Sequence, residues 1–220
     1  MIRRAKPVAI AMLLFLLLLG GCASTKEAEP LAGEQLHRRL VTTLVEAAYG
    51  LDTRSIMAKS VEELLPDSAL PMSLITGIPL FAEQLSRFKD EVNGAFLFTA
   101  WEIAPLLEPV ITEISWSDDR ALASSLRSGA ATLRREQRDE LLALITPILA
   151  EALKPAMNRW TALIDWYHLY RESIKLLKIE ELPLPDADIE GHLTLLYLDR
   201  YCTALGDEEE RLRSPKTEVR

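Results

Sequence analysis

The chain has 220 residues and carries 25 Lys and Arg against 33 Asp and Glu, a net charge of −8. This length is enough for one domain with a substantial core. The negative charge argues against nucleic acid and against electrostatic adsorption to anionic lipid, because both surfaces are themselves negative.

The N-terminal segment is typical of an export signal. Arg3, Arg4 and Lys6 precede an uninterrupted apolar run over residues 8–19. A basic start, a short apolar run and small residues before a cleavage site make a secretory signal. The run is shorter than the about 20 apolar residues that a membrane-spanning helix needs. Residues 1–21 are therefore predicted to be a signal peptide.

The sequence Leu19-Gly20-Gly21-Cys22 resembles the bacterial lipobox. The resemblance implies that Cys22 carries a diacylglycerol thioether and acyl chains such as palmitate, and becomes the mature N-terminus. The residue after Cys22 is Ala23 and not Asp. In double-membraned bacteria a lipoprotein without Asp at this position usually goes to the outer membrane, so the resemblance implies the periplasmic face of that membrane. The alternative is an ordinary signal that leaves Cys22 free or disulfide-bonded.

Residues 22–33 are predicted to be the lipidated N-terminus and a short tether, which spans at most ~36–40 Å when extended. Loss of residues 1–21 removes three basic residues and no acidic ones, so the mature chain carries 22 basic against 33 acidic residues, a net charge of −11. Attachment to a membrane then depends on the acyl chains.

Residues 34–205 are predicted to form one all-α, bundle-like, multi-helix domain, because apolar residues recur at helical spacing. The expected helices are residues 34–50, 61–65, 80–88, 92–114, 118–129, 130–153, 156–178 and 189–205, with a split near 136–139. Pro105, Pro109 and Pro147 lie inside this pattern and predict kinked or broken helices. The charged residues 206–220 are expected to form a solvated or frayed tail.

Few residues suggest chemistry. Asp165, His168 and Glu172 share one helical face and could ligate a divalent metal, but a solvated face is the simpler interpretation. Asp188 and His192 fit a helix cap. No nucleotide, metalloprotease, redox or hydrolase motif occurs. The sequence therefore predicts no catalytic, cofactor or metal residues, and no cofactor.

Two further features concern the core. Cys202 lies in an apolar helical stretch and is expected to be a buried free thiol; a reactive thiol is the alternative. Trp160, Leu163 and Tyr167 share a face that predicts ordinary core packing. A hydrophobic pocket that also uses Trp166 and Tyr170 is the other interpretation.

Several phrases resemble a bacterial envelope family, domain of unknown function 4197. They are Gly77-Ile78-Pro79-Leu80, the segment from Ala104-Pro105 and Pro109 to Ile114-Ser115-Trp116, Ala130-Ala131-Thr132, Asp139-Glu140-Leu141 with Pro147, and Leu198-Asp199 with Glu208-Glu209-Glu210. Arg200 stands where family members usually carry a glycine. The resemblance implies an exported, mostly helical, lipid-anchored or periplasmic protein and no particular activity.

Together these observations predict a bacterial lipoprotein held to the membrane by Cys22. We expect a non-enzymatic binding or assembly factor whose partner is an envelope protein. The alternative is a helical carrier for an apolar ligand or lipid, which a deep cavity larger than about 300 Å³ would favour.

Overall fold

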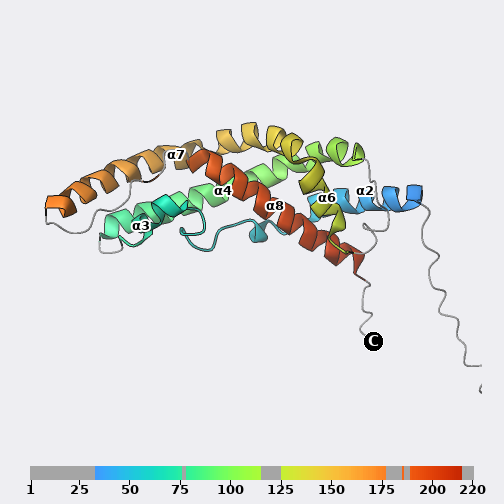
Figure 1. The fold of residues 1–220 in the computed structure, drawn as a ribbon, viewed down its shortest axis with the longest axis horizontal. Coiled ribbons are helices and arrows are strands. Elements are labelled where there is room, and N and C mark those ends of the chain that lie inside the picture. Colours follow the sequence, from blue (N-terminus) through green and yellow to red (C-terminus); the bar gives the residue numbers. More distant parts are fainter. Residues whose placement is uncertain (1–32, 76–77, 115–124, 177–184, 186–188, 215–220) are drawn as a thin grey trace, which may run out of the picture. The chain divides into compact units, whose positions relative to one another are not determined.

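The computed structural model describes residues 33–75, 78–114, 125–176, 185 and 189–214. The regular elements of these residues are all helical, which confirms the all-α prediction for this part of the chain. In order they are α2 (Gly33–Gly50), the 3-10 turns η1 (Thr53–Ser55) and η2 (Asp67–Ala69), α3 (Leu70–Ser73), α4 (Pro79–Thr112), α6 (Ser128–Glu136), α7 (Arg138–Leu176) and α8 (Ile189–Arg213) (Figure 1). The described residues from His37 onward belong to one compact unit.

The core of this unit is built on the contact between α4 and α7. Each helix buries apolar residues three or four positions apart, so that one face of each is turned inward. Phe88 of α4 and Trp160 of α7 meet with their ring centroids 5.4 Å apart. Beside them, Arg159 makes two hydrogen bonds to Glu91, of 2.9 and 2.6 Å. This partly buried pair fixes how α7 lies along α4.

The prolines were expected to kink or break the helices; the break is wrong, and the kink stays a prediction. α4 continues through Pro105 and Pro109, and α7 continues through Pro147 and Pro155 (Figure 1). The helices expected at 80–88 and 92–114 are therefore one helix, and residues 138–176 form another. All four prolines lie on exposed positions. Each proline has no N–H, so the carbonyl four residues earlier lacks its helical hydrogen bond. That carbonyl faces solvent, and apolar burial on the opposite side of the helix stabilises it.

Other boundaries also differ from expectation. The split near residues 136–139 is confirmed, because α6 ends at Glu136 and α7 begins at Arg138. Residues 61–65 form turns rather than a helix. The helix expected at 118–129 lies mostly outside the described residues, and its last positions belong to α6.

The frayed tail predicted from residue 206 is wrong as far as Arg213. α8 continues to Arg213, and Gly206, Glu208 and Glu209 are buried. This part of α8 packs against α6. Its acidic residues have partners there, so their charge does not drive the segment into water.

Candidate binding surface

The acidic residues near the end of α8 have a structural role. Glu209 accepts hydrogen bonds from the backbone N–H groups of Gly129 and Ala130, at 3.0 and 2.9 Å. Arg213 completes the arrangement with a 2.7 Å ion pair to the same carboxylate. Glu209 therefore caps the N-terminus of α6, where the side chain of Arg127 makes no capping bond.

Ion pairs at the surface flank this cap. Arg127 pairs with Asp207 and Glu210, and Arg134 pairs with Asp199. These carboxylates of α8 are bound to Arg127, which precedes α6, and to Arg134 within α6. The sequence patterns did not predict that carboxylates of α8 bind the start of α6. The available indication was that Arg127, just before α6, is not a capping residue.

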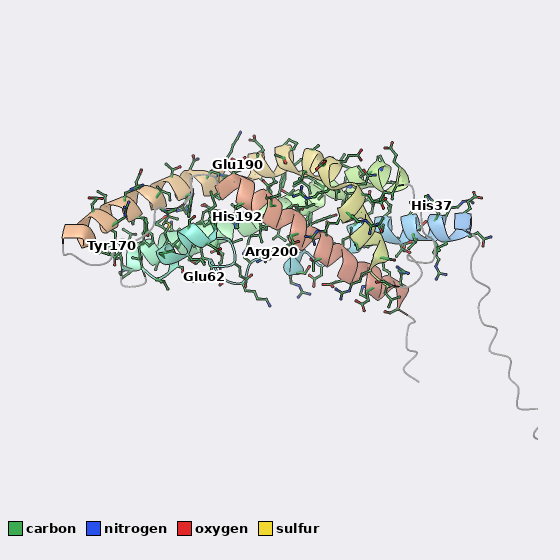
Figure 2. The ribbon with its side chains drawn as sticks, viewed as in Figure 1. His37, Glu62, Tyr170, Glu190, His192 and Arg200 are labelled. Carbon is green, nitrogen blue, oxygen red and sulfur yellow. The ribbon has the colours of Figure 1, made fainter. Side chains whose placement is uncertain are left out.

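Two polar side chains hold the segment of residues 51–65 against the helices. Asn93 of α4 accepts from the N–H of Ala58 at 2.7 Å and donates to its carbonyl at 3.0 Å. Arg200 of α8 donates to the carbonyl of Met57 at 3.0 Å and to Glu63 at 2.8 Å. The Arg200 hydrogen bond lowers the pKa of Glu63. Figure 2 labels Arg200 beside the segment that carries these contacts.

The residues considered for metal binding do not form a site. Asp165, His168 and Glu172 are exposed on α7. Within the described residues, no group of three His, Cys, Asp or Glu side chains is placed to hold a metal ion. Asp188 and Cys22 lie outside the described residues, and His192 is half-buried on α8.

The buried thiol and phenols belong to the core. Cys202 is a buried free cysteine, as predicted, and burial raises its pKa to about 12. Tyr197 packs edge-on against Phe96 and stacks on Tyr201. Burial also raises the pKa of both tyrosines. These groups stay protonated and out of contact with solvent at neutral pH.

The aromatic part of α7 divides between core and surface. Trp160, Leu163 and Tyr167 are buried, which confirms the core prediction. Trp166 and Tyr170 instead line an open groove between α7 and the start of α4. We call this the terminal groove; it measures about 350 Å³ and is lined by Ile78, Phe81, Trp166, Leu169, Tyr170 and Ser173. Tyr170 is labelled near the end of α7 in Figure 2.

A second apolar surface lies along α4. We call it the aromatic face and define it by Trp101, Tyr49 and Phe98, whose exposed fractions are 74%, 60% and 53%. A hollow of about 240 Å³ adjoins it, lined by Ala48, Tyr49, Leu51, Thr53, Ala100, Trp101 and Ala104. Sequence analysis missed this face, although Phe98 and Trp101 lie off the buried stripe that contains Phe96 and Ile103.

The apolar character of α4 extends beyond this face. Among the described helices, only α4 is long and apolar enough to cross a membrane by length and composition. However, 44% of its most apolar 18-residue window is buried inside the domain. The length and composition of α4 therefore agree equally with a core helix that packs on α7.

Comparison of the chain with models of protein families, with curated proteins and with solved structures found no match. The resemblance to domain of unknown function 4197 therefore stays a prediction.

Proposed function

We propose that this chain is a bacterial lipoprotein of the cell envelope that acts by binding and not by catalysis. The basic and apolar start, followed by Leu19-Gly20-Gly21-Cys22, supports export and lipid attachment at Cys22. Ala23 supports the periplasmic face of the outer membrane. The acidic mature chain fits this anchoring, because it has little electrostatic attraction of its own for anionic lipid.

The terminal groove is the observation that carries the binding function. Its volume of about 350 Å³ lies in the range of ligand sites, and its lining is largely apolar. Leu169 in its lining is 70% exposed, so the groove offers an apolar contact at the surface. An open groove suits an apolar segment of an envelope protein. An enclosed cavity would suit the alternative function, a lipid carrier.

Lipid attachment is tested by Cys22→Ala. We expect this variant to lose labelling by radioactive palmitate and to leave the membrane fraction, because the acyl chains are its anchor. Unchanged labelling and fractionation would contradict the proposed attachment.

Binding in the groove is tested by a photo-crosslinking amino acid placed at Leu169 in living cells, with exposed Thr161 of α7 as the matched position. We expect a discrete protein adduct at position 169 that Trp166→Ser diminishes, and none at position 161. An adduct with lipid alone, together with copurifying lipid in native mass spectrometry, would support the carrier. Identical patterns at both positions would contradict a groove-specific partner.

A further inference from the structure

We propose that the aromatic face rests on an uncharged lipid surface, so that the domain lies against the membrane that holds its acyl chains. This inference rests on the proposed lipid attachment at Cys22 and adds a second contact with the bilayer. The occupant of the face is then the interfacial region of that bilayer.

The side chains of the face have the chemistry of a membrane interface. Trp101 and Tyr49 are amphipathic aromatics, a type enriched where headgroups meet acyl chains. Phe98 lies one helical turn before Trp101 on the same exposed side of α4. Residues 92–101 contain no charged side chain, so this stretch brings no charge into the bilayer. Transfer of the three rings from water to the interface removes apolar surface from water.

The charges around the face select the kind of lipid. Glu46 and Glu102 are exposed close to it along α2 and α4, and Arg54 is already paired with Asp52. Anionic headgroups would repel these carboxylates, whereas zwitterionic headgroups would not. A surface of uncharged lipid therefore fits best.

The tether allows the anchor and the face to reach the same leaflet. Tyr49 lies sixteen residues after Gly33, where α2 begins, about 24 Å at the helical rise. The tether before the helix spans up to ~36–40 Å when extended. Because anchoring keeps the bilayer at high effective concentration, even weak apolar contact is enough to dock the face. A partner protein in free solution has no such gain in effective concentration near the face.

The contact is tested with an environment-sensitive fluorophore on Phe98→Cys in the full lipidated chain, reconstituted in phosphatidylcholine vesicles. Thr161→Cys, exposed on α7, is the matched control. The introduced cysteine is the reactive thiol, since Cys202 is buried. We expect blue-shifted emission, quenched by nitroxide-labelled lipid, at position 98 and water-like emission at position 161. Water-like emission at both positions would overturn the inference.

A partition measurement separates this inference from the proposed attachment. A chain with Cys22→Ala keeps only the weak contact of the aromatic face, so its partition is measured at high lipid concentration. There we expect Phe98→Ser with Trp101→Ser to lower partition into the same vesicles by about tenfold or more. Leu195→Ser, an exposed leucine of α8 that lines neither described hollow, should leave partition unchanged; an equal loss would overturn the inference.

The remaining outcomes have distinct meanings. If the lipidated wild type fails to float with vesicles, the proposed attachment fails. If it floats but position 98 reports water, only the aromatic-face contact fails. If the fluorophore at position 98 shows blue-shifted emission without vesicles, and dilution of the protein abolishes the shift, the face binds a second copy of the chain. The proposed lipid contact is then overturned.

Discussion

Glu209 is a carboxylate with an exposed fraction of 0% at the centre of the contact between α6 and α8. A buried charge is costly unless hydrogen bonds and an opposite charge compensate for its lost hydration. Here two backbone N–H groups donate hydrogen bonds to the carboxylate, and Arg213 provides the opposite charge. One side chain thereby closes the start of α6 and fixes the last turns of α8.

Replacement of this carboxylate should be costly. Glu209→Gln keeps the shape but removes the charge, which weakens the α6 cap and leaves Arg213 without its buried counter-charge. We expect a loss of about 2–4 kcal/mol in the free energy of unfolding, measured by urea denaturation. Glu210→Gln, which removes a surface pair with Arg127, is the control and should change stability little. Equal losses would contradict a special role for Glu209.

Gly129 is required for the close approach of the same carboxylate. A Cβ at this position would lie 2.8 Å from Oε1 of Glu209 and 3.0 Å from Cδ1 of Leu44. We expect Gly129→Ala to cost about 1–3 kcal/mol in thermal or urea unfolding, because both neighbours are packed.

Gly94→Ala is the matched control for this substitution. A Cβ at Gly94 meets nothing within 4 Å, and the residue lies inside α4. The helix propensity of alanine should then add up to about 1 kcal/mol of stability. A stabilising Gly129→Ala would show that the approach of Glu209 is looser than described.

At the scale of elements, residues 51–65 have little regular structure and depend on side chains from two helices. Asn93 bonds both backbone groups of Ala58, and Arg200 bonds Met57 and Glu63. Arg200 thus makes the position of this segment depend on α8.

Removal of this contact should loosen the segment without unfolding the helices. We expect Arg200→Ala to speed amide hydrogen exchange at Ser55–Leu65 and to expose the segment to proteolysis. Acidification should loosen the same segment, measured as lower protection after correction for the slower intrinsic exchange at low pH. Hydrogen bonding to Arg200 lowers the pKa of Glu63, so its contribution is full above the ordinary carboxyl pKa and is lost as the pH falls through the lowered pKa. Arg54→Ala, which removes an exposed pair within the segment, is the control and should leave exchange at Leu64 unchanged.

The helices could be predicted from the sequence, but their continuity could not. Apolar spacing marked α2, α4, α7 and α8, because each buries one face. A proline inside such a pattern interrupts a helix in isolation. Whether it does so in the fold depends on the side of the helix it occupies, and that is set by tertiary packing. Pro105 and Pro147 face solvent, so burial on the opposite side outweighs their cost.

At the scale of the whole domain, the sequence patterns missed hydrogen bonds between distant polar residues and the exposed apolar surfaces. Glu209 and Gly129 are 80 residues apart, so no local pattern links the acidic run of α8 to the start of α6. The terminal groove was partly anticipated, through Trp166 and Tyr170. The aromatic face was not, because the exposure of Trp101 depends on which side of α4 its neighbours cover.

The extent of the domain can be tested by truncation. A chain that ends at Leu205 lacks Glu208, Glu209 and Arg213, so we expect it to lose the cooperative thermal transition seen by circular dichroism. A chain that ends at Ser214 retains all three and should unfold like the full chain. If the shorter chain unfolds cooperatively at an unchanged temperature, residues 206–213 are dispensable for the fold, as the sequence predicted.

The position of α8 has a consequence for how the protein is made. Synthesis proceeds from the N-terminus, so α4 is complete long before α8, whereas α7 ends at Leu176, only thirteen residues before α8 begins at Ile189. Until then, the segment at residues 51–65 lacks Arg200, and the start of α6 lacks Glu209. These contacts of long sequence separation form slowly. The segment at residues 51–65 and the start of α6 therefore reach their final positions only when synthesis is almost finished, although the contact between α4 and α7 does not need α8.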